Sequence, residues 1–319
     1  MFQRFPDHNG YDDPQFSSFY GQTLPLLKRG IPVELVHMEN TPFKDTFNGL
    51  QVLVMSYSNM KPMKSEYHNY LADWVKKGGT LVYCGEDVDP YQTVLEWWNT
   101  AGNAYKAPSE HLFEAMGLSR NPGDGTYRFG KGTVIVMRED PKHFVLKGGN
   151  DRKYFETIVS AYESKTGKKI EIKNNFMVER GPYTIAAVMD ESSSKEPLKL
   201  SGLYIDLFDK NLPVLTVKQI NPGEQGYLYD LNKVLGKVKA KVLCGASRIY
   251  DEKVGKQSYS FVAKSPLHTT NVSRVLLPRK PGKVLVNGKA EQPEWDESSK
   301  TLLLSFENDP AGVNVSIEW

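Results

Sequence analysis

Two short segments hold the side chains that could do chemistry, residues 56–59 and 84–87. In the second, Cys84 stands before Gly85, as a nucleophilic thiol at a strand-to-helix turn does. Such a turn also needs a glycine two residues earlier, where this chain has Val82. No histidine followed two residues later by a glutamate comes after it to act as base and orienting group. The pattern therefore favours a buried strand cysteine over a nucleophile.

Carboxylates also cluster here, at Glu86, Asp87 and Asp89. A pair of carboxyl groups is what glycoside hydrolysis requires. The same residues fit a solvated acidic turn, in which Pro90 begins a helix and an aspartate caps it. We expect capping first, and next a polar contact from Glu86 and Asp87 to a sugar or to a neighbouring chain.

Aromatic and amide side chains could complete a carbohydrate rim. Tyr57 and Asn59 lie in the first segment, and Trp97 or Trp98 could stack on a sugar ring. Two adjacent tryptophans cannot share one face of a helix, because neighbours along the chain point in different directions. We expect one of them to be in the core and the other to be exposed or at an interface.

The sequence contains no pattern that is typical of a metal or cofactor site. The six histidines lack metal-ligand spacing, and two cysteines, Cys84 and Cys244, are too few for a disulfide framework or a zinc site. Residues 130–132 (Gly-Lys-Gly) read as a hairpin turn and not as a phosphate cradle, because a strand follows them and not a helix. The sequence predicts no cofactor and no metal.

A strand–helix–strand unit at residues 50–88 must position both segments. Residues 51–57 and 80–84 are short apolar runs without charge, as strands buried on both faces require. Between them Ser65 is placed to cap a helix through its hydroxyl, and Gly78-Gly79 ends that helix. The unit predicts a parallel sheet, in which ligands collect beyond the carboxyl ends of the strands.

The remaining elements up to residue 167 continue an α/β pattern. Residues 1–5 could be the tail of a strand, and Pro25 should kink or divide the first helix. The expected helices are at 13–30, 91–101, 109–116 and 151–165, and the further strands at 33–38 and within 125–138.

From about residue 168 the spacing changes to short strands separated by turn residues, which is typical of antiparallel sandwiches. Asn287-Gly288 is a strong hairpin signal. The expected strands are 170–172, 183–189, 203–208, 214–220, 226–229, 242–244, 247–250, 258–263, 270–277, 283–286, 301–306 and 313–319. We predict an α/β plus all-β chain, with an α/β domain at 1–167 and β-sandwich regions at 168–245 and 246–319, which could form one domain or two.

The composition excludes some partners. The chain of 319 residues has 39% hydrophobic and 24% charged residues, and 40 basic against 38 acidic residues leave a net charge of +2. This balance gives no reason to expect nucleic acid or a membrane as partner. The N-terminus lacks a signal-peptide pattern, and no apolar run has the length of a membrane span. We expect a soluble protein, cytoplasmic, or periplasmic if an upstream signal is missing.

Several longer segments of the sequence resemble a known protein family. Residues 20–40 (YGQTLPLLKRGIPVELVHMEN) and the glycine-ended helix before TLVYCG resemble the flavodoxin-like domain of multidomain bacterial glycoside hydrolases. That domain is similar to the β-galactosidase trimerisation domain, which has a class I glutamine amidotransferase-like fold without amidotransferase chemistry. Residues 179–187, 203–208, 222–225, 284–288 and 302–306 resemble the β-sandwich modules that end such enzymes.

The resemblance implies a function without catalytic residues in this chain. In that family the catalytic carboxylates belong to a barrel on the N-terminal side, and nothing of that barrel is present here. We therefore expect a non-catalytic module of carbohydrate metabolism, which forms homo-oligomers or joins a glycosidase barrel and lends loops to its sugar site. The alternatives are a Cys84-dependent amidotransferase-like hydrolase and a free-standing carbohydrate-binding protein.

Overall fold

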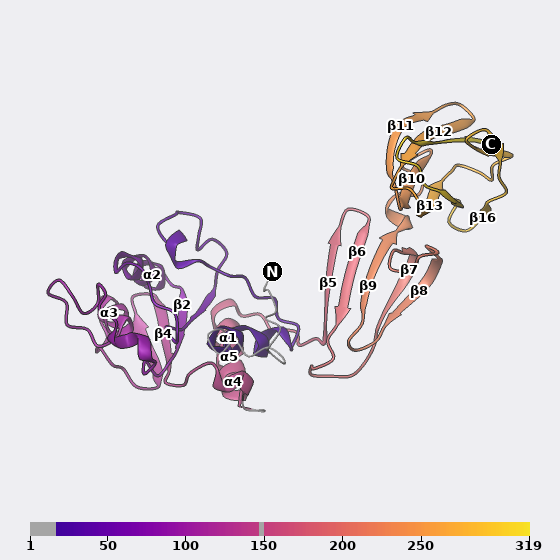
Figure 1. Cartoon of the computed structure of the whole chain (residues 1–319). Coiled ribbons are helices and arrows are strands. Elements are labelled where there is room, and N and C mark those ends of the chain that lie inside the picture. The colour runs from indigo at the N-terminus through magenta and orange to yellow at the C-terminus, as the bar shows by residue number, and fades with distance from the viewer. Residues whose placement is uncertain (1–16, 147–149) are drawn as a thin grey trace. The chain divides into compact units, whose positions relative to one another are not determined.

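The computed structural model describes residues 17–146 and 150–319 (Figure 1). The chain folds into two compact units, which divide between Lys173 and Asn174. The first is α/β and the second all-β, which confirms the predicted fold class. The strand tail predicted at residues 1–5 lies outside the described residues. Within the described stretches, no helix combines the length and the apolar character needed to cross a bilayer.

A four-stranded sheet forms the centre of the first unit, in the order β1-β2-β4-β3. β1 (Val52–Met55), β2 (Thr80–Cys84) and β4 (Gly132–Met137) are parallel, and β3 (Gly125–Phe129) is antiparallel to β4. Helix α2 (Glu66–Lys76) connects β1 to β2 and confirms the predicted strand–helix–strand unit. All five residues of β2 are buried, because helices cover both of its faces.

Helix α2 ends as predicted but begins differently. Gly78 follows it with φ +127°, a conformation that glycine adopts without steric cost. The predicted hydroxyl cap from Ser65 is wrong, because Ser65 has helical dihedral angles (φ −67°, ψ −28°) and its side chain makes no capping bond. Its carbonyl oxygen instead accepts a hydrogen bond from the amide of His68 at 3.1 Å.

Helices cover the two faces of the sheet separately (Figure 1). Side chains along β2 point alternately to the two faces of the sheet. Leu81 and Tyr83 therefore pack in a core with α2 and α3, and Val82 and Cys84 pack in a core on the other face. The second core includes residues of α1, α4 and α5. The helices are α1 (Ser17–Leu27), α3 (Pro108–Ala115), α4 (His143–Leu146) and α5 (Arg152–Thr166), so the predicted helices at 109–116 and 151–165 are confirmed, and the one at 13–30 is confirmed over its described part.

The strand predicted at residues 33–38 is wrong. Residues 31–37 form no ladder, and a short 3₁₀ helix, η1 (Met38–Asn40), follows them. An apolar groove of about 870 Å³ is lined both by this segment and by β1. The four residues of β1 are only half-buried, and among the described residues β1 pairs with β2 alone. The apolar run is there, but no strand in the described part of the chain pairs with it.

The helix predicted at residues 91–101 is also wrong. A 3₁₀ helix, η2 (Pro90–Thr93), is followed by turns. The side chain of Asn99 accepts a hydrogen bond from the Glu96 amide and donates one to the Val94 carbonyl, and Asn103 donates to the carbonyl of Trp97. Asparagine side chains that bond the local backbone in this way offer it an alternative to the helix.

The second unit begins with a five-stranded antiparallel sheet in the order β5-β6-β9-β7-β8. Its strands are β5 (Asn175–Arg180), β6 (Tyr183–Val188), β7 (Leu198–Asp206), β8 (Val214–Ile220) and β9 (Gln225–Asp230). The sequence predicts all of them except β5, in which polar residues interrupt the alternation. The strand predicted at residues 170–172 is wrong, because these residues form no ladder.

Two further sheets form a sandwich, in the orders β10-β13-β17-β16 and β11-β12-β18-β14-β15. Their strands are β10 (Lys241–Gly245), β11 (Arg248–Val254), β12 (Ser258–Lys264), β13 (Thr270–Leu276), β14 (Lys283–Val286), β15 (Lys289–Ala290), β16 (Glu294–Asp296), β17 (Thr301–Glu307) and β18 (Val313–Glu318). Both sheets contribute to its core, with Tyr259, Val275 and Ile317 fully buried.

The hairpin between β14 and β15 confirms the predicted Asn-Gly turn. Asn287 and Gly288 have φ of 48° and 78°, and two central residues with positive φ match the right-handed twist of the flanking strands. A separate apolar cluster includes Ile205 and Tyr229 of the five-stranded sheet together with Leu276 of the sandwich, so the two parts of this unit share buried contacts.

Candidate functional site

The loops beyond the carboxyl ends of β1 and β2 meet around Asp87. This residue has φ +59°, and its carboxylate accepts hydrogen bonds from three side chains. Ser109 Oγ lies 2.7 Å and Arg138 Nη1 2.6 Å from Oδ2, and the hydroxyl of Tyr83 donates to Oδ1. Burial, and then the Asp87 charge, raise the pKa of Tyr83 well above its ordinary value. The arrangement holds a charged carboxylate in place from several directions.

A second ion pair lies beside the first. Lys61 Nζ is 2.7 Å from Asp89 Oδ2, with both side chains largely buried, and it also donates to the carbonyl of Tyr57. Burial lowers the pKa of Lys61, and Asp89 opposes that shift. Asp89 Oδ1 accepts the amide of Tyr91 at 3.1 Å, which confirms the predicted cap, although the element that it caps is η2.

A chain of neutral hydrogen-bonding groups runs behind these loops. The hydroxyl of Tyr57 is 2.6 Å from His68 Nε2, and His68 Nδ1 is 2.9 Å from His111 Nδ1. One of the two Nδ1 atoms must carry the proton that the other accepts. Burial and the neighbouring His111 lower the pKa of His68 to about 3, and burial lowers that of His111 as well. At neutral pH both imidazoles are therefore uncharged.

Sequence reasoning missed this histidine pair, because His68 and His111 come from different helices, α2 and α3. One signal was available. His68 precedes Leu71 by three residues and Val75 by seven, so it belongs to the face of α2 that faces the core. A histidine on such a face is buried, and a buried imidazole needs a hydrogen-bonding partner.

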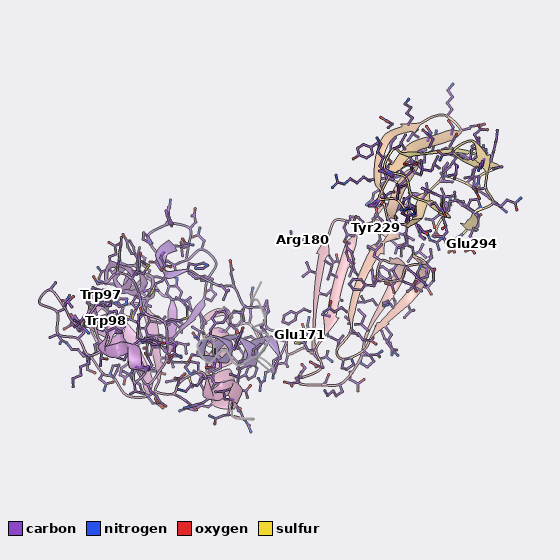
Figure 2. The ribbon with its side chains drawn as sticks, viewed as in Figure 1. Trp97, Trp98, Glu171, Arg180, Tyr229 and Glu294 are labelled. Carbon is purple, nitrogen blue, oxygen red and sulfur yellow. The ribbon has the colours of Figure 1, made fainter. Side chains whose placement is uncertain are left out.

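The predicted tryptophans have different environments (Figure 2). Trp98 is 2% exposed, and its indole N–H donates to the carbonyl of Gln92 at 3.0 Å. Trp97 is half-buried and donates to the carbonyl of Pro62 at 2.8 Å. The two rings are nearly perpendicular, with centroids 5.7 Å apart. Trp98 is a core residue, whereas Trp97 is partly exposed.

The other predicted rim residues also differ in how much of their surface is exposed. Glu86 is exposed, and Asn59 is half-buried with φ +59°. Tyr57 is 3% exposed, and the carboxylate of Asp87 is engaged by its three donors. The structure therefore leaves Asn59 and Glu86, together with part of Trp97, available to solvent.

Cys84 is completely buried in the sheet. Its Sγ lies 3.9 Å from Met137 Sδ, and burial raises the pKa of the thiol far above its ordinary value. Since the thiolate is the reactive form, this position does not favour a nucleophile. Cys244 is also a free thiol, and burial raises its pKa to about 11. Among the described residues, no three His, Cys, Asp or Glu side chains are grouped as metal ligands.

Comparison with known proteins gives no match to a family model and none to a curated sequence. Among solved structures the chain is similar to Gan42B, a GH42 β-galactosidase, at 14% identity and a TM-score of 0.37, covering 71% of this chain and 37% of that one. A catalytic mutant of Gan42B from G. stearothermophilus gives 13% identity, a TM-score of 0.35 and coverage of 70% and 38%.

A GH31 dextranase from Flavobacterium johnsoniae, FjDex31A, in a mutant complexed with isomaltotriose, gives 10% identity and a TM-score of 0.27. The match covers 81% of this chain and 38% of that one. These neighbours are glycoside hydrolases, and this chain spans less than two-fifths of the length of each of them.

Proposed function

We propose that the chain is a non-catalytic module of a carbohydrate-active protein. Its α/β unit would mediate oligomerisation and lend the loops beyond β1 and β2 to the rim of a sugar site. The sequence resemblance to the flavodoxin-like domain of glycoside hydrolases supports this role. The observation that carries the proposal is the environment of Asp87, a largely buried carboxylate at this edge.

A general acid in glycoside hydrolysis must hand a proton to the leaving group, and its partner must attack the sugar or activate water. Asp87 accepts hydrogen bonds from Tyr83, Ser109 and Arg138, so both carboxylate oxygens are already engaged. Asp89 is likewise held by Lys61 and by the backbone of η2. These groups are arranged to fix the loops and not to exchange protons with a substrate.

The solvent-exposed groups of the same edge suit binding. Glu86 and Asn59 supply hydrogen-bonding atoms, and Trp97 is partly exposed. Because the Trp97 indole N–H already donates to Pro62, this residue would offer its ring to a sugar and not its donor. An aromatic surface flanked by a few polar groups is a common composition for a ligand-binding rim.

Light scattering on the purified chain tests the oligomerisation role, and we expect a mass above that of the 36.0 kDa monomer. A monomer at high protein concentration would count against it. Nitrophenyl glycosides test the non-catalytic role: we expect no turnover, and turnover abolished by a single substitution in this chain would refute the proposal.

A glycan array with the chain alone separates the module from a free-standing carbohydrate-binding protein. Binding that is lost in Trp97→Ala but kept in Phe43→Ala would favour the free-standing protein. Phe43 is a suitable control because it is an aromatic residue of the same unit with 66% of its surface exposed.

A further inference from the structure

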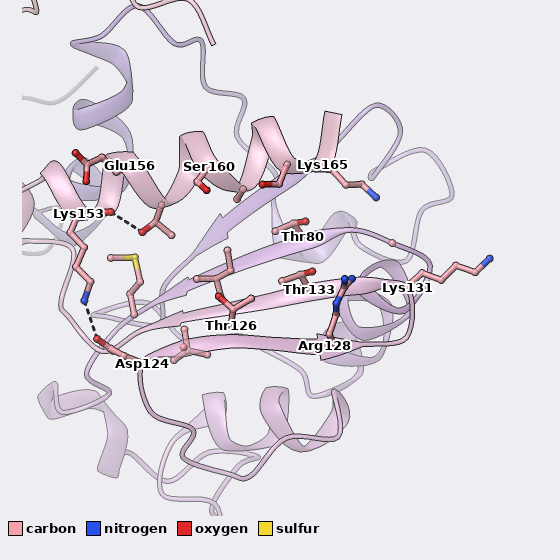
Figure 3. A pocket seen from close by; sticks show the side chains of 18 residues that line it. Thr80, Asp124, Thr126, Arg128, Lys131, Thr133, Lys153, Glu156, Ser160 and Lys165 are labelled. Atoms are coloured by element: carbon pink, nitrogen blue, oxygen red, sulfur yellow. Dashed lines mark hydrogen bonds and ion pairs between the residues drawn. The ribbon is translucent and has the colours of Figure 1, made fainter. Parts of the chain in front are cut away.

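A second surface of the first unit, on the face of the sheet that α5 covers, has the features of a ligand site. An open hollow of about 850 Å³ lies between α5 and the face of β2, β4 and β3 (Figure 3). Its size falls within the range of small-molecule sites. Its lining is unusual for a surface next to a helix, because hydroxyl and basic side chains predominate over apolar ones.

Paired residues on three neighbouring strands form one end of the hollow. Thr80 of β2 is paired with Thr133 of β4, and Thr133 is paired with Arg128 of β3. Paired residues on adjacent strands point to the same face and lie roughly 5 Å apart. The three side chains therefore form a row across the sheet, and Ser160 and Ser164 of α5 face it from the other wall.

Two lysines join this row. Lys165, at the end of α5, extends its ammonium group towards Gly78. Lys131, in the turn between β3 and β4, lines the same end of the hollow, but its ammonium group points away from it (Figure 3). A side chain at Gly78 would begin 3.3 Å from Lys165 Nζ and 3.9 Å from Lys131 Cβ, so the absent side chain leaves room for the ammonium group. Arg128 and Lys165 thus lie beside a patch of hydroxyl groups, with Lys131 at its border.

These cations have no carboxylate partner within the described part of the chain. At the opposite end of the hollow, Lys153 is paired with Asp124 at 3.1 Å. Arg29 and Arg138 are also paired, at 2.6 Å from Asp151 and Asp87. Since like charges repel, Arg128, Lys131 and Lys165 gathered around one hollow favour a negatively charged occupant.

We propose that this end of the hollow binds a tetrahedral oxyanion, a phosphate or sulfate group, carried by a sugar. A tetrahedral oxyanion ester presents three outer oxygens, which can accept hydrogen bonds from Arg128, Lys165 and the neighbouring hydroxyl groups. The hydroxyls of Thr80, Thr133 and the α5 serines can both donate to and accept from the hydroxyls of a sugar. The proposal does not depend on the role of the rim loops.

Isothermal titration calorimetry with glucose 6-phosphate, glucose 6-sulfate, inorganic phosphate and glucose tests this assignment. We expect both sugar esters to bind more tightly than inorganic phosphate, and glucose to bind most weakly. Preference for one ester identifies the oxyanion. Absence of binding by both esters, or equal affinity for esters and inorganic phosphate, would overturn the proposal.

Variants localise the site. In Arg128→Gln combined with Lys165→Gln, affinity for the esters should fall at least tenfold, since each substitution removes a charged hydrogen-bond donor. Lys153→Gln is the matched control, because it removes one charge from the paired end of the same hollow, and it should change affinity less than twofold. If circular dichroism showed that the double variant had lost its fold, Lys165→Gln alone, at an exposed position near the end of α5, would replace it. Unchanged affinity in the correctly folded variant would overturn the proposal.

Discussion

Acid should destabilise the first unit through His68. Its pKa falls from an ordinary 6.5 to about 3 in the folded chain, because burial and His111 both disfavour the charged imidazole. Between these values the unfolded chain binds a proton that the folded chain does not, so the stability is fully present above pH 6.5 and declines as the pH falls towards 3. A pH of about 5 lies roughly 1.5 units below the pKa of the unfolded chain. Since each unit corresponds to about 1.4 kcal/mol, the free energy of unfolding should fall by about 2 kcal/mol.

Urea unfolding followed by tryptophan fluorescence at about pH 8 and pH 5 measures this loss. His68→Gln removes the titrating group, so its free energy of unfolding should depend less on pH than that of the wild type, by about 2 kcal/mol. The substitution also breaks the bond to Tyr57 and lowers stability at every pH, which is why the difference between the two pH values is the informative quantity. His37→Gln, at an exposed histidine, is the control. An equal pH dependence in His68→Gln and the wild type would refute the reasoning.

Three further outcomes follow from packing. Asp87→Ala leaves a largely buried guanidinium unpaired and should lower the free energy of unfolding by about 3–5 kcal/mol, whereas Glu86→Ala should change it by less than about 0.5 kcal/mol; equal effects in denaturant titrations would contradict the role given to Asp87. Iodoacetamide should label Cys84 only after unfolding, as mass spectrometry would show, and rapid labelling of the native protein would contradict its burial. Gly132→Ala places a methyl 1.9 Å from a carbonyl oxygen of α2 and should cost about 1–3 kcal/mol, whereas Gly123→Ala, which meets nothing within 4 Å, should leave the melting temperature unchanged.

Local patterns sufficed where neighbouring residues determine the structure. The strand–helix–strand unit could be predicted because uncharged strands and a glycine-ended amphipathic helix are each encoded within a few residues. Helix α5 ends at Gly167, whose φ of +69° is the left-handed exit that its sequence predicts. The turn at residues 287–288 is specified by its own two residues in the same way.

Long-range contacts explain the failures. Residues 33–38 have the composition of a strand, but a strand also needs a partner, and partners are not encoded locally. The pairs His68–His111 and Asp87–Arg138 join residues separated by 43 and 51 positions, so no spacing rule could reveal them. For the same reason the sequence indicated Asp87 as a candidate binding residue, but it did not reveal the three side chains that donate hydrogen bonds to its carboxylate.

The one-sided pairing of β1 has a mechanical consequence. Within residues 17–146 and 150–319, each inner strand of the sheet is held by ladders along both sides, while β1 is held along one side by the four residue pairs that it forms with β2. Detaching it breaks fewer of these ladder bonds than detaching β2 or β4, and its residues line an apolar groove. Amide protons of β1 should therefore exchange for deuterium before those of β2, the inner strand next to it.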